Sequence, residues 1–457
     1  MSVVPNGSSI GARFITGSTM RHVVVMTATS AIGLMAMFMV DLADLWFLTL
    51  LNQIEITAAI GFAGTIVFSN LSVGLGLAIA AGALVAQAMG RGEEDKARET
   101  ASAALCLSLF TGLIVAIGIV VFARPMLTLL GASGDALEFA RHYLIVIAPG
   151  FLLLAGAITV SFVLRAIGDP RRAMYVTLVT AITNAVLDPI FIFGMDLGIA
   201  GAALATVFAN LFSFAVGLHA LHRHHRFVVR PRITSIRQNL RPIMRIALPA
   251  IATQLATPFA IAYMTRITAT FGNDAVAAVA VINRLVPVAF GVIFSLSGAV
   301  GPIIGQNYGA GKLDRVSQTL KDAMVFSSLY TVAVSVVLLA VAGYMPAWFS
   351  ATPVAAELIT FYYTFIAITW AFAGAQFVAQ AAFNNLDRPQ WSMWFNWGKA
   401  TIGTIPLLHL GAAWGGATGV LTALGAVNIM FGLAAAITAF ALVRTMATQA
   451  PVTGDAT

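Results

Sequence analysis

The chain alternates long apolar runs with short breaks that hold almost all of its charge. Only 9% of its 457 residues are charged and 59% are hydrophobic, with a mean hydropathy of +0.91. A soluble protein would carry about a quarter charged residues. About 20 consecutive apolar residues suffice to cross a bilayer as a helix. The sequence therefore predicts an all-α polytopic membrane protein.

Glycine, proline and charge clusters mark the breaks between these runs. Several runs exceed the minimum length for crossing a bilayer, so we expect tilted helices or helices that extend beyond it. The breaks divide the chain into twelve predicted transmembrane helices. Their limits are 22–51, 54–86, 98–122, 137–164, 173–194, 199–221, 243–271, 275–305, 316–343, 355–386, 391–411 and 416–443.

Basic residues concentrate in alternate breaks, and Arg124 and Arg141 are the exceptions. The basic breaks hold Arg91, Lys96 and Arg98; Arg165, Arg171 and Arg172; the segment 223–245; Lys312, Arg315 and Lys321; and Arg388 and Lys399. Such clusters mark the cytoplasmic side of a membrane protein. The sequence therefore predicts a multi-pass protein of the inner (plasma) membrane with both termini in the cytoplasm. The net charge of +7 follows from this topology and does not indicate a nucleic-acid partner.

An internal repeat organises the chain. The segments VAQAMGRGEEDKARET (85–100) and IGQNYGAGKLDRVSQT (304–319) align without a gap at an offset of 219 residues. The same offset places Pro170 on Pro389. An equal offset over more than a hundred residues indicates two homologous halves. Each half holds six helices, so both halves cross the membrane in the same sense, as in transporters with parallel repeats.

The repeat predicts three parts of the chain. These are an N-terminal six-helix lobe (1–221), a basic cytoplasmic linker (222–242), and a C-terminal six-helix lobe with a short tail (243–457). Within the linker, His222, His224 and His225 lie among arginines. That composition favours a solvated basic segment facing anionic lipid over a metal site.

Acidic residues inside the predicted helices are few. Asp41 and Asp44 lie in FMVDLADLWF, and Asp188 lies in NAVLDPIFIFG. A carboxylate at membrane depth costs about 2.5–3.5 kcal/mol, so a functional role is the default interpretation. A rise of 1.5 Å per residue places Asp41 about 28 Å and Asp188 about 22 Å from the cytoplasmic ends of their helices. Both therefore fall in the outer half of the first lobe.

Other oxygen-bearing groups have matching positions. Asn184 lies one helical turn before Asp188, and Ala202 and Thr206 repeat that spacing on the next helix. Together with Asp41 these residues form an all-oxygen set, which suits a hard cation or a proton. Asp44 shares a helix face with Asp41 and lies nearer the outer surface, so it is either a mouth or cavity residue or part of the site. No other metal site is predicted.

Four motifs stand out in the chain as a set: the paired GxG loops, RAIGDP (165–170), NAVLDPIFIFG (184–194) and, shortly after it, GIAGAALAT (198–206). Together these motifs resemble the multidrug and toxic compound extrusion (MATE) family. The resemblance implies a twelve-helix secondary antiporter in two lobes that expels cationic or amphipathic compounds by alternating access, in exchange for protons or sodium.

The resemblance also implies a branch and a set of site residues. In the DinF-like branch, the cation site uses the residues that match Asp41, Asn184, Asp188, Ala202 (through its carbonyl) and Thr206. The family's other branch uses a glutamate on the seventh helix. Here that helix reads LPAIATQLATPFAIAYM and contains no acid, so we expect the coupling ion in the first lobe only.

Three alternatives are weighed against this interpretation. A lipid-linked precursor flippase of the same superfamily would need cationic cavity residues, for which Arg266 and Arg284 are the candidates. An enzyme is not expected, because no HExxH or GxSxG motif is present. The GxG loops lack the ending of a phosphate-binding loop, so tight turns are favoured. We expect no cofactor beyond the coupling proton or sodium ion, and a monomer in the lipid bilayer whose partners are small-molecule drugs or organic cations.

Overall fold

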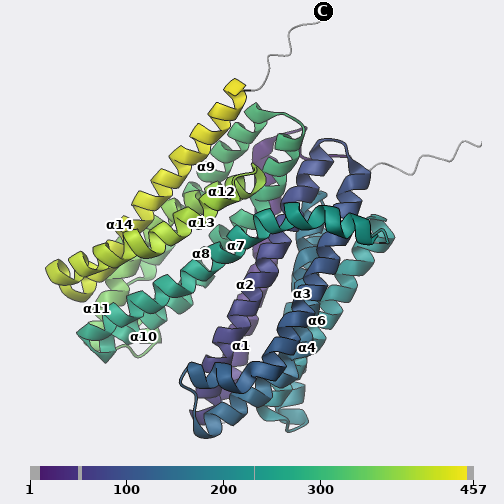
Figure 1. Ribbon diagram of the computed structural model, residues 1–457. Coiled ribbons are helices and arrows are strands. Elements are labelled where there is room, and N and C mark those ends of the chain that lie inside the picture. Colours follow the sequence, from purple (N-terminus) through teal and green to yellow (C-terminus); the bar gives the residue numbers. More distant parts are fainter. Residues whose placement is uncertain (1–10, 50–53, 231, 450–457) are drawn as a thin grey trace, which may run out of the picture. The chain divides into compact units, whose positions relative to one another are not determined.

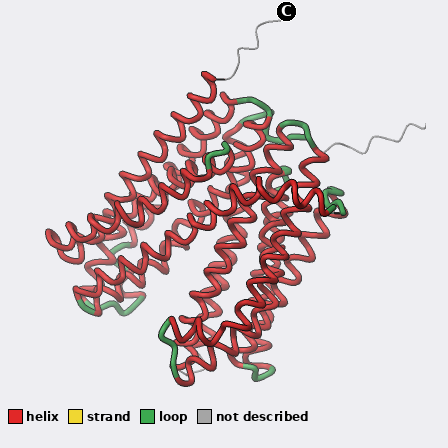
Figure 2. The backbone as a smooth tube through the Cα atoms, in the orientation of Figure 1, coloured by secondary structure: helices red, strands yellow, loops and turns green. Residues whose placement is uncertain are grey.

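The computed structural model describes residues 11–49, 54–230 and 232–449. All regular structure in these ranges is helical, which confirms the predicted all-α class (Figure 2). The N-terminal half contains eight helical elements (Figure 1). They are α1 (Thr19–Thr49), α2 (Ile54–Gly90), α3 (Glu94–Leu129), α4 (Gly134–Ala166), α5 (Pro170–Pro189), the π-helix η1 (Ile190–Gly194), α6 (Gly198–His219) and the π-helix η2 (Ala220–His224).

The C-terminal half follows the same plan with more interruptions. Its elements are α7 (Ile233–Thr268), η3 (Ala269–Phe271), α8 (Asn273–Gly309), α9 (Leu313–Val341), α10 (Met345–Trp348), α11 (Pro353–Phe361), η4 (Tyr362–Ile366), η5 (Ala367–Thr369), α12 (Trp370–Asn385), α13 (Pro389–Gly398), η6 (Lys399–Gly403) and α14 (Thr404–Gln449).

Eleven helical segments among the described residues are long and apolar enough to cross a membrane. The last of these, Pro389–Gln449, is interrupted where Gly415 and Gly416 leave the helical conformation. This interruption coincides with the predicted break between 411 and 416. The described chain therefore contains twelve spans, as predicted.

The described chain forms two compact units, each with its own apolar core. Unit 1 comprises Ile32–Ile251 and the described residues before Phe14, and unit 2 comprises Phe14–Ala31 and the described residues from Ala252 onward. In unit 1, α2 packs against α4, which also contacts α3 and α6. In unit 2, α8 and α14 pack against α12. The domain limits drawn from the repeat stay a prediction. The predicted linker (222–242) overlaps α7, which begins at Ile233, so the second part of the linker is helical.

The two GxG loops are helix caps of identical design. Gly92 and Gly311 have φ angles of 75° and 71°. In each loop the next backbone N–H donates to a carbonyl five residues earlier, that of Ala88 or Asn307, at 2.9 Å. This is the Schellman arrangement, in which a glycine without a Cβ adopts the left-handed conformation and ends the helix. The loops are therefore tight turns, as favoured above.

Two basic residues lie elsewhere than the sequence indicated. Lys399 was assigned to a cytoplasmic break, but it opens η6, within the apolar segment that begins at Pro389. The assignment was wrong because Lys399 was grouped with Arg388 as a basic break although it falls inside the predicted helix 391–411. His225 was predicted to be solvated, but its side chain is buried and pairs with Asp169.

Candidate functional site

Helices α1 and α5 of unit 1 approach closely at Gly33. A Cβ at this position would overlap the Thr177 hydroxyl of α5, so only glycine permits the approach. Eleven residues further along each helix lie Asp44 and Asp188, whose side chains are hydrogen-bonded to each other. Eleven residues correspond to about 16 Å of helix. The two helices therefore run side by side from the glycine contact to the carboxyl pair.

The carboxyl pair requires a shared proton. An ionised carboxylate has no hydrogen to donate, so a bond between two carboxyl groups forms only when one of them is protonated. Asp188 is 1% exposed. Its Oδ2 atom and the Oδ1 atom of Asp44 have no hydrogen-bond partner among the described residues. The pair can therefore hold one proton and still offer two acceptor oxygens to a ligand.

Asp41 and Tyr143 flank this pair. Asp41 lies close enough to Asp44 for electrostatic interaction, and its side chain is exposed. Tyr143 of α4 lies within electrostatic range of all three carboxyl groups. Tyr143 was not predicted, because a single tyrosine in an apolar helix carries no sequence signal that separates it from packing residues.

The remaining predicted residues come from α5 and α6. The Oδ1 atom of Asn184 is buried without a partner among the described residues, one turn before Asp188. The Thr206 hydroxyl donates to the Ala202 carbonyl at 3.1 Å. Within α6 that carbonyl also accepts the helical N–H of Thr206, so the Thr206 hydroxyl oxygen is the group that can still accept from or bind a ligand.

The start of α6 is held against the π-helix η1. A Cβ at Gly201 would meet the backbone carbon of Phe191 at 2.6 Å, so a glycine is required for this contact. Ile192 and Ala202 then pack together with Tyr143 in a small apolar cluster. π-Helices inside longer helices frequently mark functional sites. Here the π-helix follows directly after Asp188 and Pro189.

The functional groups of this site are oxygens. Carboxyl, amide and carbonyl oxygens bind hard cations, and the carboxyl pair binds a proton. The described residues hold no group of three or more His, Cys, Asp or Glu side chains placed to bind a metal. Chemically, the carboxyl pair can take up a proton, and the free oxygens of the site suit a hard cation such as sodium.

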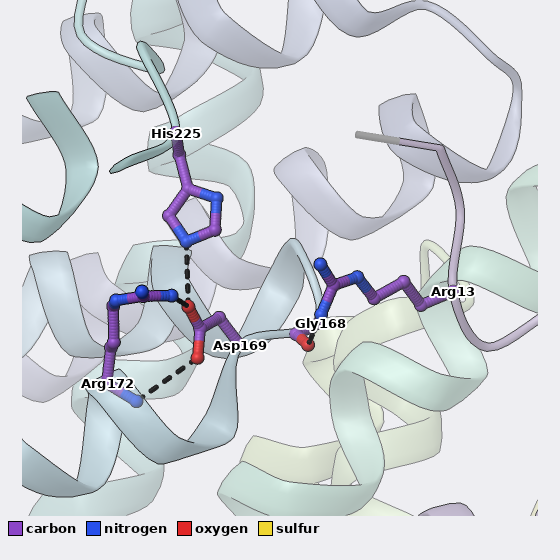
Figure 3. Close-up of polar contacts among 5 residues, drawn as sticks. All are labelled: Arg13, Gly168, Asp169, Arg172 and His225. Atoms are coloured by element: carbon purple, nitrogen blue, oxygen red, sulfur yellow. Dashed lines mark hydrogen bonds and ion pairs between the residues drawn. The ribbon is translucent and has the colours of Figure 1, made fainter. Parts of the chain in front are cut away.

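A second polar cluster lies outside the spans, between α4 and α5 (Figure 3). Asp169 accepts hydrogen bonds from the Arg172 backbone and guanidinium and from His225 Nε2, the last at 2.7 Å. Burial would raise the pKa of Asp169, but the bonds from His225 and Arg172 hold it well below its usual range. Arg13 Nη1 donates to the neighbouring Gly168 carbonyl at 3.2 Å. This cluster fixes the turn at the start of α5 and was not predicted.

The two cationic candidates for a flippase both lie in unit 2. Arg266 of α7 and Arg284 of α8 are exposed. Neither forms an ion pair with a carboxylate among the residues that the structure describes. The flippase alternative stays a prediction.

Comparison with known proteins identifies the family. The MatE family model matches residues 29–190 and 249–408. The FAD transporter of Shewanella oneidensis is 30% identical over 418 residues, which cover 90% of this chain and 92% of that protein. The multidrug export protein MepA of Staphylococcus aureus is 26% identical over 339 residues, covering 72% of this chain and 73% of that protein.

Solved structures share the fold. The Vibrio cholerae MATE transporter VcmN in its bent form has a TM-score of 0.88 at 24% identity, covering 93% of this chain and 97% of that one. A transporter of the MOP superfamily from Pyrococcus furiosus has a TM-score of 0.90 at 20% identity, covering 97% of this chain and 100% of that one. With the family model matching more than half of its length, the chain belongs to the MATE family of membrane transporters.

Proposed function

We propose that the protein is a secondary active efflux antiporter of the inner membrane. It exports amphipathic small molecules, including the cationic multidrug compounds that the family resemblance implies, in exchange for protons or sodium ions. Both of its termini face the cytoplasm. One observation carries the proposal: Asp188 is buried in a membrane-spanning helix, lies within hydrogen-bonding distance of the Asp44 carboxyl group and keeps an oxygen without a partner among the described residues.

The carboxyl pair supplies a means of coupling. Uptake of an ion changes the charge and the hydrogen bonds between α1 and α5. If the ion favours one state of the transporter and the substrate favours another, a gradient of the ion drives export. A proton would occupy the Asp44–Asp188 bond. A sodium ion would take the unpartnered oxygens of Asn184 and Asp188, with a further oxygen from Thr206.

The test is efflux from proteoliposomes driven by a proton gradient or a sodium gradient, each imposed alone. Replacing Asp188 by Asn should abolish gradient-driven efflux and leave the amount of folded protein unchanged. Asp44→Asn should also abolish proton-driven efflux, because a permanent amide N–H takes the place of the exchangeable shared proton.

Asp135→Asn is the matched control, since Asp135 is an exposed acid at the start of α4. That variant should behave as the wild type. Gradient-driven efflux at the wild-type rate in Asp188→Asn would contradict the proposed coupling site.

A flavin nucleotide is a second candidate substrate. It is favoured by the FAD transporter relative, which matches 90% of this chain at 30% identity. The same vesicles, loaded with FAD or with a fluorescent cationic dye, separate the two candidates. Export of FAD without export of the dye would restrict the proposed function to flavin nucleotides.

A further inference from the structure

A lysine lies at membrane depth in unit 2. Lys399 comes ten residues after the start of α13 at Pro389, about 15 Å along the helix axis. Gln376 lies nine residues before the end of α12 at Asn385, about 14 Å from the same turn. The hydrocarbon core is about 30 Å thick. Lys399 Nζ donates to Gln376 Oε1 at 3.1 Å, so the two groups meet about 15 Å from the α12–α13 turn, well inside two membrane-spanning segments.

This ammonium group has no carboxylate partner in the part of the chain that the structure describes. No described acidic side chain lies within ion-pair distance of Lys399. The sequence from 388 to 454 contains no acid at all. A long lysine side chain near a helix end can extend to the membrane surface. Lys399 instead bonds to a glutamine at its own depth. An ionisable group held in this way inside a membrane is by default functional.

Two glutamines of α12 offer hydrogen-bond donors on the helix face that contacts Lys399. Gln376 uses its carbonyl oxygen for the lysine, so its amide nitrogen remains as a donor. Gln380 lies one turn further on the same face of α12, and is 6% exposed. Its Nε2 atom has no partner among the described residues. An ammonium and two amide nitrogens select for an oxyanion, because ionised phosphate and carboxylate oxygens only accept.

Lys399 lies in a π-helical segment of the backbone. Lys399 opens the π-helix η6, and its carbonyl accepts a hydrogen bond from the Thr404 hydroxyl at 2.7 Å. π-Helices inside longer helices frequently lie at functional sites. Lys399 keeps part of its surface exposed.

We propose that Lys399, with the amides of Gln376 and Gln380, binds a phosphate or carboxylate group of the transported molecule. The inference rests on the proposed function and deepens it by adding a substrate class beside the cationic compounds: amphipathic compounds that carry an anionic group. A charged hydrogen bond in such a site contributes enough that its loss weakens binding about tenfold or more.

Riboflavin and flavin mononucleotide form a matched pair of probes, since they differ only by one phosphate. Their equilibrium binding to the purified full-length protein is measured in nanodiscs of phosphatidylcholine. The wild type should bind the mononucleotide more tightly than riboflavin. Lys399→Met should weaken mononucleotide binding about tenfold and leave riboflavin binding unchanged. Lys399→Arg should retain most of the affinity. Lys321→Met, which removes an exposed charge from α9, is the control and should change neither.

The proposal is overturned if Lys399→Met binds the mononucleotide as the wild type does, or if both probes weaken equally. It is also overturned if the wild type does not distinguish the two probes. Adding phosphatidylglycerol tests the other source of phosphate. If this lipid displaces the mononucleotide through Lys399, the site belongs to a lipid head group. A parallel dye-efflux assay reads the proposed function separately, because binding does not depend on ion coupling.

Discussion

Asp169 offers a test of how the turn before α5 is stabilised. Its side chain is buried, caps α5 by accepting the Arg172 backbone N–H, and pairs with the buried His225. These interactions join the α4–α5 turn to the segment after α6. We expect Asp169→Ala to lower thermal stability without changing the residues of the carboxyl site.

The size of the effect follows from the three interactions that the substitution removes. Removal of a helix N-cap costs about 1 kcal/mol. Loss of a buried charged hydrogen bond, here from His225, costs about 1.5–3 kcal/mol. The Arg172 side chain is 37% exposed, so its ion pair adds less than about 1 kcal/mol. The total of about 2.5–5 kcal/mol should lower Tm by about 5 °C or more in a unit of this size.

The assay is thermal unfolding of the purified protein in detergent, followed by loss of the monodisperse species. Asp169→Asn should show a smaller loss, since an amide oxygen still caps the helix. Glu93 gives the matched control. It precedes α3 as Asp169 precedes α5, and Arg91 lowers its pKa, but it is exposed. Glu93→Gln should leave Tm unchanged. A Tm for Asp169→Ala within about 1 °C of the wild type would refute the reasoning.

The pH dependence has a definite sign. Because the pKa of Asp169 is lowered in the folded state, its contribution is fully present above the unfolded value, about pH 4. The contribution is lost as the pH falls through the lowered folded pKa. The carboxylate of Asp169 should therefore raise the Tm of the wild type above that of Asp169→Asn by the same amount from about pH 5 to 8. This Tm difference should shrink only below about pH 4.

Two further predictions concern packing and topology. Gly33→Ala should cost about 1–3 kcal/mol by forcing α1 from Thr177, and adding Thr177→Ala should restore part of the lost Tm. Gln238→Cys, in a background with Cys106 replaced, should react with an impermeant maleimide in inverted vesicles only. Gln238 suits this test because it is exposed, and labelling in intact cells would contradict the predicted cytoplasmic linker.

The number and approximate positions of the helices were predictable from the sequence, because apolar runs and glycine or proline breaks are local signals. The residues at which the helices end were harder to predict. The second span was predicted to end at residue 86, where the last apolar run gives way to charge, but α2 continues to Gly90. A helix does not stop at the membrane surface. It ends where the backbone is capped, here by the left-handed conformation of Gly92.

The carboxyl pair was only partly predictable. The rarity of acids in the spans pointed to Asp41, Asp44 and Asp188. The helical rise, counted from the cytoplasmic ends of the two helices, placed Asp188 closer to the cytoplasm than Asp41. In the structure Asp188 meets Asp44, because the contact between Gly33 and Thr177 sets the register of α1 against α5. The alignment of one helix against another depends on contacts between the helices. The sequence periodicity of a single helix does not predict those contacts.

The repeat shares its scaffold between the halves but not its charges. At the offset of 219 residues, Asn184 and Asp188 fall on Gly403 and Leu407. An ion taken from water into an apolar medium needs charge compensation. Unit 2 lacks acids at these positions, so a coupling cation has no compensating charge there. Unit 2 instead holds the positive charge of Lys399 within its spans, where unit 1 holds carboxyl groups, and a positive charge suits an anionic group. The two units are thus equipped for different ligands, and an ordered cation beside Lys399 would contradict this division.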